Sequence, residues 1–315
     1  MTGFKDESNE ENGLYGQTPI EIMGKIIDQI KQGKTLVSDG AWGTFLQQKG
    51  MQAGECPEEW NLTHPDDVFD IAKSYIDSGA DMVETNSFGG TKYKLEKYGL
   101  AGKVFEINKA AAQLSRKAAG DKFVLGSVGP TGKILMMGDV TEEELYEAFK
   151  EQAQGLEAGG ADAIMVETMT DLDEARLAVK AAKENTGCEV FCTMTFEKTV
   201  DGEFRSMMGI APTDMVNSII EAGAELIGAN CGNGIVDMIG IVEEIRKSNP
   251  DIPVLVHANA GMPVYQDGET VFPETPDEMA SLIPKIIDAG ANIVGGCCGT
   301  TPVHICKVRE AVDKR

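Results

Sequence analysis

The chain has 315 residues, of which 42% are hydrophobic and 25% are charged, enough to bury the core of one large α/β domain or two small ones. Its formal net charge of −23 argues against nucleic acid and anionic membranes as partners, since both need concentrated Lys and Arg. Short apolar stretches, a polar N-terminus and an odd number of cysteines, seven, predict a cytoplasmic protein without a signal peptide, a membrane span or a disulfide framework.

The first predicted feature along the chain is a flexible acidic tail over residues 1–17, followed by a single domain over residues 18–315. Thr18-Pro19-Ile20-Glu21 combines an N-cap hydroxyl, a proline at the first helical position and a glutamate three residues after the cap, so it predicts a helix that runs towards Gln32. Eight apolar runs rich in β-formers then predict strands at Thr35 to Ser38, Met82 to Glu84, Phe123 to Ser127, Ala163 to Glu167, Val190 to Thr195, Leu226 to Ala229, Val254 to His257 and Ile293 to Gly295.

Amphipathic segments with a period of 3.6 separate these runs. They predict helices at Pro65 to Ser78, Val104 to Ala119, Thr141 to Ala158, Leu172 to Asn185, Thr213 to Ala222, Asp237 to Ser248 and Pro276 to Ala289. Strand followed by helix, repeated eight times in this length, is typical of a closed parallel barrel. We therefore predict a (β/α)8 TIM barrel with one N-terminal helix before the first strand.

A short motif recurs four times where a predicted helix passes into a strand, at Gly79-Ala80-Asp81, Gly160-Ala161-Asp162, Gly223-Ala224-Glu225 and Gly290-Ala291-Asn292. Each glycine is expected to end its helix in the left-handed conformation and to allow a short turn. An open doubly wound sheet would use similar turns, so the motif supports parallel strands without proving that the sheet closes.

Three cysteines stand where predicted strands end, just before glycine turns. Cys231 follows the sixth strand, and the adjacent Cys297 and Cys298 follow the eighth. Adjacent cysteines rarely form a disulfide, but three thiolates can hold one Zn²⁺ and leave its fourth tetrahedral position for water or a substrate thiol. Any one of them alone would more often be a packing residue. The other four cysteines, Cys56, Cys188, Cys192 and Cys306, do not stand at the end of a predicted strand before a glycine turn. Of these, Cys188, Cys192 and Cys306 are expected to be structural.

Carboxylates also gather at the predicted strand ends, at Asp39, Glu84 and Glu167. A single carboxylate at a loop start is usually an N-cap or a surface acid, but several beside a metal-bound thiol could grip the ammonium group of an amino acid. His257 also ends a strand and competes as a zinc ligand or as a partner of the ligands. His64 and His304 lie near helix starts and are not expected to bind metal.

Seven motifs in this chain resemble those of the homocysteine S-methyltransferase family, and most closely the homocysteine-binding module of cobalamin-dependent methionine synthase. They occur in the family's order and cover nearly all of the chain after the tail. The motifs are Asp39-Gly40-Ala41-Trp42-Gly43-Thr44, Gly79-Ala80-Asp81 with Glu84-Thr85-Asn86-Ser87-Phe88, Ser127-Val128-Gly129-Pro130-Thr131-Gly132, Val166-Glu167-Thr168, Asn230-Cys231, Asn259-Ala260-Gly261 and Gly295-Gly296-Cys297-Cys298-Gly299-Thr300-Thr301-Pro302.

The resemblance implies a (β/α)8 barrel whose zinc is held by Cys231, Cys297 and Cys298. It further implies that Asp39 and Glu167 bind the amino group of homocysteine and that Thr85 and nearby backbone amides hold its carboxylate, with Glu84 and Asn259 also in the substrate site. Zinc would lower the pKa of the homocysteine thiol, and the resulting thiolate would attack an electrophilic methyl group to give methionine.

The methyl donor is less directly indicated. Betaine-using members carry a tyrosine after the phenylalanine of the second-strand motif, where this chain has Gly89 after Phe88, so betaine is not expected. The resemblance favours methylcobalamin or another methylcorrinoid, which a separate corrinoid protein would have to deliver because the chain ends at Arg315 without a corrinoid-binding module. Glycine-containing loops at Gly129 to Gly138 and Thr199 to Gly209, with Met136-Met137 and Met207-Met208, are expected to form an adaptable rim for it.

Other readings stay open from the sequence. The donor could be S-methylmethionine, S-adenosylmethionine or another methylated metabolite, and the acceptor another thiol. A non-catalytic barrel with a structural zinc is a competing class, which a fourth protein ligand such as His257 would support. An aldolase-like barrel would need a lysine at a strand end for a Schiff base, and we find none. The oligomeric state is not indicated.

Overall fold

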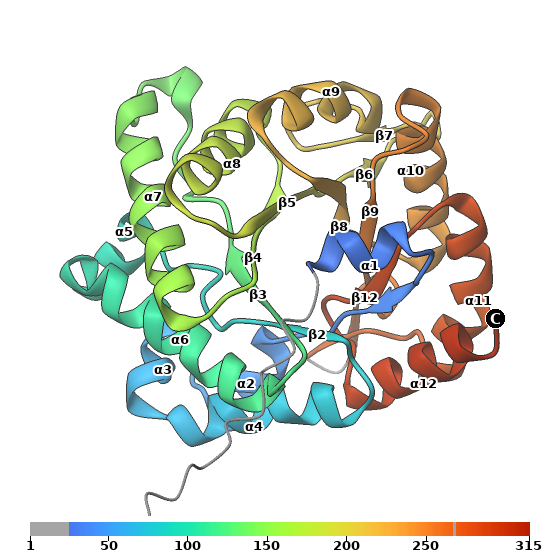
Figure 1. Cartoon of the computed structure of the whole chain (residues 1–315), viewed down its shortest axis with the longest axis horizontal. Coiled ribbons are helices and arrows are strands. Elements are labelled where there is room, and N and C mark those ends of the chain that lie inside the picture. Colours follow the sequence, from blue (N-terminus) through green and yellow to red (C-terminus); the bar gives the residue numbers. More distant parts are fainter. Residues whose placement is uncertain (1–24, 267–268) are drawn as a thin grey trace, which may run out of the picture.

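A computed structural model describes residues 25–266 and 269–315 of the protein. It contains a ring of parallel strands surrounded by helices (Figure 1). The predicted tail and the predicted helix start at Thr18 lie outside the described residues. The strands of the ring are β1 (Leu36–Val37), β2 (Met82–Glu84), β3 (Phe123–Val128), β4 (Ala163–Met169), β5 (Glu189–Met194), β8 (Leu226–Gly234), β9 (Val254–Asn259) and β12 (Ile293–Gly296). All eight predicted strands are therefore confirmed.

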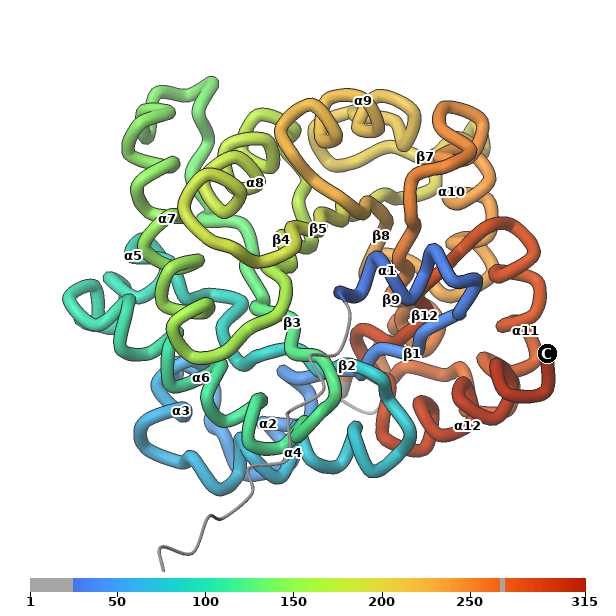
Figure 2. The backbone as a smooth tube through the Cα atoms, viewed as in Figure 1, coloured from blue at the N-terminus to red at the C-terminus, as the bar shows by residue number. Residues whose placement is uncertain are grey.

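The helices follow one another around the outside of the ring, as the chain trace in Figure 2 shows. The outer helices are α4 (Pro65–Asp77), α6 (Val104–Ala119), α7 (Glu142–Gly159), α8 (Leu172–Asn185), α9 (Pro212–Ala222), α10 (Ile235–Ser248), α11 (Pro276–Ala289) and α12 (Pro302–Asp313). Shorter elements are α1 (Ile26–Lys31), α2 (Gly43–Gln48), α3 (Trp60–Thr63), α5 (Lys92–Leu95), the 3₁₀ turns η1 (Pro57–Glu59), η2 (Glu96–Tyr98), η3 (Ala101–Lys103) and η4 (Leu135–Met137), and the strands β6 (Glu197–Lys198), β7 (Phe204–Arg205), β10 (Val264–Gln266) and β11 (Glu269–Val271).

The strand order is β1-β12-β9-β8-β5-β4-β3-β2, with parallel pairing throughout, so the barrel is closed except at one seam between β1 and β2. Hydrogen bonds from Asp81 N to Val37 O (2.7 Å) and from Val37 N to Asp81 Oδ2 (3.0 Å) cross this seam. A third, from Glu84 N to Asp39 Oδ2 (2.8 Å), crosses it at the other end of the strands. One backbone bond and two bonds to aspartate side chains thus complete the ring where the strand ladder stops.

The four predicted helix-to-strand turns recur with the same contacts. Gly79, Gly160, Gly223 and Gly290 all have φ between +97° and +117°, as a left-handed helix end requires. The polar residue two positions later accepts a hydrogen bond from the backbone N–H of the preceding strand in the ring, as in the bonds from Val124 N to Asp162 and from Val254 N to Asn292. These turns form the end of the barrel opposite to the strand carboxyl ends.

The interior of the ring changes from apolar to polar along the strands. An apolar cluster fills the part of the ring where the strands begin. It is covered by Ile26, Ile27 and Ile30 of α1, which lies across the end of the ring that faces the reader in Figure 1. Because side chains two apart share one face of a strand, the residue two positions after each apolar one also points inward. The apolar residues Leu36, Met82, Leu125, Met165, Phe191, Leu255 and Ile293 are thus followed by Ser38, Glu84, Ser127, Glu167, Thr193, His257 and Gly295.

Candidate metal and substrate site

A cavity of about 270 Å³ opens above this polar layer, at the carboxyl ends of the strands. This is the end at which TIM barrels carry their active sites. It is lined by residues in the carboxyl-terminal parts of seven of the eight strands or in the segments that follow them, namely Gly40, Ala41, Trp42, Gly43, Thr44, Leu46, Pro57, Glu58, Glu84, Thr85, Asn86, Ser87, Phe88, Ser127, Glu167, Thr168, Cys231, His257, Gly296, Cys297 and Cys298.

The three predicted metal-binding cysteines come together on one wall of the cavity. Asn230 of β8 pairs with His257 of β9, and Gly296 of β12 pairs with Ala258, so Cys231 and the cysteine pair lie at one level on either side of β9. The three sulfurs lie within 4.8 Å of one another, and the Cys231 and Cys298 sulfurs are 3.8 Å apart. A tetrahedral Zn²⁺ with Zn–S bonds of about 2.3 Å requires sulfurs about 3.8 Å apart. The donor set therefore fits zinc.

Among the histidine, cysteine, aspartate and glutamate side chains of residues 25–266 and 269–315, the cluster holds the three cysteines alone. No histidine or carboxylate of that part of the chain joins the group, and the predicted competitor His257 lines the cavity without belonging to it. An open fourth position is typical of catalytic zinc, whereas structural zinc has four protein ligands.

The thiols share charge even without a metal. Hydrogen bonds from Cys297 and Cys298 lower the pKa of Cys231 to about 3, and the Gly232 backbone N–H and the Asn259 side chain also stabilise the thiolate. The same coupling raises the pKa of Cys298 to about 11 and that of Cys297 well above its ordinary value. One negative charge is thus held by three sulfurs that face the cavity.

Glu167 brings a carboxylate to the same cavity. Its Oε1 accepts a hydrogen bond from Ser127 Oγ, and its Oε2 accepts one from Asn230 Nδ2 (3.1 Å). Burial raises its pKa to about 7, against the opposing effect of the Ser127 bond. A cationic group that entered the cavity would favour the ionised form.

Glu84 and His257 face each other with unused hydrogen-bonding capacity. Glu84 Oε1 lies 3.5 Å from His257 Nδ1, and neither Glu84 Oε1 nor His257 Nε2 has a hydrogen-bond partner. Burial, with the nearby Glu167 and Asp39 charges, raises the pKa of Glu84 well above its ordinary value, and burial lowers that of His257 to about 4. Both pKa shifts favour the uncharged forms, and the pair leaves polar atoms available to a ligand.

The remaining predicted substrate residues lie in different places. Thr85 lines the cavity, with its hydroxyl bonded to Ser87 Oγ (2.6 Å). Asp39 lies behind the cavity wall, where its carboxylate accepts from Ser38 Oγ (3.1 Å), Trp42 Nε1 (2.9 Å) and Glu84 N. Burial, opposed by these hydrogen bonds, raises its pKa to about 6. Asn259 also lies outside the lining and acts on the Cys231 sulfur.

Several lining residues were not weighed from the sequence as site residues. Trp42 and Phe88 add aromatic surface, and Ser127 orients Glu167. Glu58 accepts a hydrogen bond from Gly89 N (2.7 Å), and a Cβ atom at Gly89 would lie only 2.8 Å from the same carboxylate oxygen. A tyrosine at position 89 would therefore require the Glu58 carboxylate to move. The motif Phe88-Gly89 could have pointed to this close approach.

The other cysteines, with His64 and His304, are not part of the cavity lining. Cys56, Cys188 and Cys192 are buried, whereas Cys306 is exposed on α12 and adds nothing to the core. The ring of His64 stacks on Trp60 with centroids 4.1 Å apart, and His304 bonds Thr301 at the start of α12. The expectation that neither histidine binds metal agrees with these contacts.

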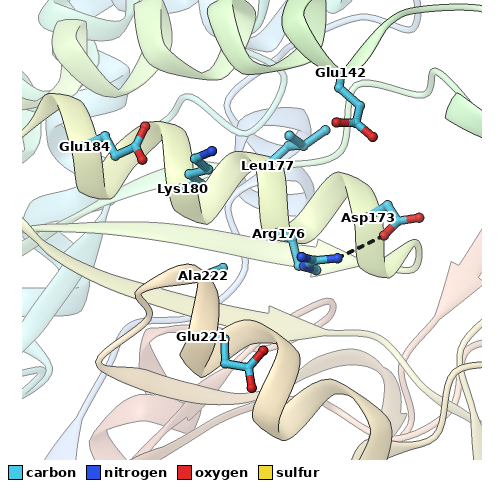
Figure 3. Close-up of a pocket in the computed structure, with 8 residues that line it drawn as sticks. All are labelled: Glu142, Asp173, Arg176, Leu177, Lys180, Glu184, Glu221 and Ala222. Atoms are coloured by element: carbon cyan, nitrogen blue, oxygen red, sulfur yellow. Dashed lines mark hydrogen bonds and ion pairs between the residues drawn. The ribbon is translucent and has the colours of Figure 1, made fainter.

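A larger hollow of about 490 Å³ lies on the outside of the barrel, between α8 and α9 (Figure 3). Its charged side chains are all exposed and of both signs, with Arg176 and Asp173 forming an ion pair at 3.5 Å. The lining includes no cysteine or histidine. Size alone does not identify the site, and the smaller cavity carries the reactive groups.

No helix in the described part of the chain combines the length and apolar character needed to cross a membrane.

The fold resembles that of the homocysteine methyltransferase MmuM from Escherichia coli in its metallated form, with a TM-score of 0.73 and 20% identity over 90% of this chain and 98% of that one.

Sequence comparison finds methionine synthases among the relatives. The Mycobacterium tuberculosis enzyme is 34% identical over 306 residues, which are 91% of this chain and 25% of the relative, and the Mycobacterium leprae enzyme is 35% identical over 89% and 24%. The chain thus spans about a quarter of these relatives. The homocysteine S-methyltransferase profile matches residues 36–312. With this match over most of its length, the chain is an enzyme that belongs to the homocysteine S-methyltransferase family.

Proposed function

We propose that the protein is a zinc-dependent S-methyltransferase that transfers a methyl group to the thiolate of homocysteine and so forms methionine. The observation that carries this proposal is one cavity in which three thiols with an open metal position face buried carboxyl groups. The metallated state of MmuM, which has the same fold, supports a metal in this family. An amino-acid thiol presents the two groups, thiol and ammonium, that such a cavity would bind.

Cys231, Cys297 and Cys298 would hold Zn²⁺, which when bound lowers the pKa of a substrate thiol. Glu167 is held by Ser127 and Asn230 and would receive the ammonium group of homocysteine. We assign Thr85 and nearby backbone amides to the substrate carboxylate and Glu84 with His257 to the polar floor beneath it. Asp39 would act through Trp42 and the backbone of Glu84, because its carboxylate lies behind the wall. Asn259 would stabilise the Cys231 thiolate.

The homocysteine sulfur would supply the electron pair of the new S–CH₃ bond, and the donor would keep the pair of the bond that breaks. The surface favours a bulky donor brought by a separate methylcorrinoid protein. All exposed methionines of the described residues, Met136, Met137, Met207, Met208 and Met262, lie in loops at the cavity end of the barrel. Met136 and Met208, from different loops, line one groove together with Leu135, Leu172 and Ile210, and the acidic residues Glu142, Asp171 and Asp173 also line it. Flexible thioethers suit a contact surface that must adapt.

The test is methionine formation by zinc-loaded protein with homocysteine and, in separate reactions, methylcobalamin, S-methylmethionine or S-adenosylmethionine. We expect methionine from methylcobalamin and none from the C297S variant. Product from a sulfonium donor alone would keep the thiol chemistry but replace the proposed donor. Absence of both product and homocysteine binding would refute the methyltransferase assignment.

A further inference from the structure

Asn230 is completely buried, and its side chain uses all of its hydrogen-bonding capacity. Nδ2 donates to Glu167 Oε2 (3.1 Å) and to Thr168 Oγ1 (2.7 Å). Oδ1 accepts from Thr168 N (2.8 Å) and from Thr193 Oγ1 (2.7 Å). A single amide on β8 thus reaches across β5 to the end of β4, where the cavity carboxylate lies.

The backbone is strained at both ends of the contact between Asn230 on β8 and Thr168 on β4. In the described part of the chain, Thr168 (φ +59°) and Cys231 (φ +57°) are the non-glycine residues with positive φ. A β-branched residue is a true outlier there, and each such position costs about 1–3 kcal/mol unless its surroundings enforce it. Asn230 bonds both the N–H and the hydroxyl of Thr168, and it directly precedes Cys231 in the chain.

The bends at Thr168 and Cys231 direct the side chains of these two residues towards the cavity. The register of β4 against β5 shifts after Val166, and that of β8 against β9 shifts after Asn230. The bends turn Thr168 and Cys231 out of the regular alternation of the strands, and both line the cavity. Removal of the Asn230 amide would remove the hydrogen bonds that hold the bend at Thr168, and it would do so one residue before the bend at Cys231.

We propose that Asn230 is a positioning residue that fixes the metal-binding Cys231 relative to the ammonium-binding Glu167, an inference that rests on the proposed function. A buried asparagine that only satisfied the core would affect stability alone. A positioning residue must also affect two binding events that involve different atoms, the metal and the substrate. The chain offers the variants to separate these cases.

The test compares N230A and N230D with T193V, which removes a single donor to Asn230 and leaves its contacts with Glu167 and Thr168 in place. Zinc affinity is measured by chelator competition, homocysteine affinity by calorimetry on zinc-loaded protein, and stability by thermal unfolding. For N230A we expect both affinities to fall about tenfold, the scale of one lost hydrogen bond to a charged group. For T193V we expect less than about threefold in either.

N230D keeps the shape and both acceptor contacts of Oδ1 but places a second carboxyl group against Glu167. Because two adjacent carboxyl groups resist joint ionisation, the pH below which homocysteine binding is lost should move upward in this variant. The double variant N230A/T168G provides a rescue test. Glycine adopts the positive φ at position 168 unaided but does nothing for Cys231, so homocysteine affinity should recover in part while zinc affinity stays low.

Wild-type zinc and homocysteine affinities in N230A, whatever its melting temperature, would overturn the proposal. If N230A does not fold, N230D decides by the same two affinities and by its pH shift, and unchanged values would likewise overturn it. Failure of the wild-type protein to bind homocysteine would refute the proposed function instead, and the zinc affinities of N230A and T193V would still test the link to Cys231.

Discussion

At the scale of single residues, the cavity gathers more carboxyl groups than it can keep ionised. Burial raises the pKa of Asp39 to about 6, that of Glu167 to about 7 and that of Glu84 well above its ordinary value. Such groups cost stability when ionised, so this cost is absent at low pH and appears as the pH rises through their folded-state pKa values. An ammonium ligand removes part of the cost, which gives the cavity a physical reason to bind amino acids.

This arrangement predicts a pH dependence of amino-acid binding. Affinity for norleucine, which has no thiol, should rise as the pH passes from 6 to 7 and Glu167 ionises, by up to about tenfold. Calorimetry at constant ionic strength checks this. The E167Q variant should bind weakly with a much flatter profile, and a wild-type affinity that is flat across this range would contradict the assignment of the ammonium group to Glu167.

The metal assignment predicts unequal effects of two cysteine substitutions. C297S should lower zinc affinity by more than the roughly 100-fold that loss of a second-sphere partner can cost, because it removes a direct ligand. C306S changes an exposed cysteine outside the cluster and should retain zinc as the wild type does. Zinc content after dialysis against a chelator distinguishes them, and equal retention by both variants would show that the metal does not bind at the cluster.

The cysteines could be predicted from sequence because their placement depends only on where strands end and turns begin. The positions of Asp39 and Asn230 could not be predicted in this way. Asp39 turns into the wall because its carboxylate bridges the β1–β2 seam, a feature of barrel closure that no local pattern records. The role of Asn230 depends on β4, β5 and β8 being neighbours and on two bends that leave the strand alternation.

At the scale of elements, the seven outer helices from α4 to α11 (α5 aside) for which the sequence predicts ranges match them closely, because amphipathic periodicity defines them; no range was predicted for α12. The boundaries of α6, α8 and α11 are as predicted, and α10 begins two residues earlier, at Ile235. The short hairpins β6–β7 and β10–β11 were not predicted. Their strands have only two or three residues, too few for a period to appear, and β6 and β10 are exposed.

The four helix-to-strand turns are expected to stabilise the fold, and the turn at Gly290 offers a test. Arg246 on α10 donates to the carbonyl oxygens of Gly290 (2.6 Å) and Pro250 (3.1 Å) and to Asn292 Oδ1 (2.9 Å). Removal of these half-buried contacts in R246A should lower the free energy of unfolding by about 2–3 kcal/mol. K314A removes a largely exposed lysine with only a distant partner at 3.9 Å and should change it by less than about 0.5 kcal/mol. Urea unfolding measures both, and equal effects would show that these turns are not stabilising units.

At the scale of the whole molecule, the two ends of the barrel have different tasks. The end covered by α1 is apolar and closed, with Glu189 accepting hydrogen bonds from the first N–H groups of that helix at 2.9 and 3.3 Å. The opposite end carries the cavity, the thiols and the exposed methionines. The difference between the two ends could be predicted from the sequence, because the predicted barrel placed the reactive residues at the carboxyl ends of its strands.

This division predicts that stability and binding can be changed separately. I26A truncates a completely buried side chain in the apolar cluster and should lower the free energy of unfolding by about 3 kcal/mol. Homocysteine affinity at a temperature where the variant is folded should remain within about twofold of wild type, since the cavity lies above the polar layer. A parallel loss of affinity would show that the two ends are coupled.

The central claim is that three cysteines hold a zinc whose fourth position receives the substrate thiol, and zinc K-edge X-ray absorption tests it most directly. We expect three sulfur neighbours from Cys231, Cys297 and Cys298 in the zinc-loaded protein, and four after homocysteine is added. An unchanged coordination sphere with four protein ligands, before and after homocysteine, would mean a structural zinc and would contradict the account.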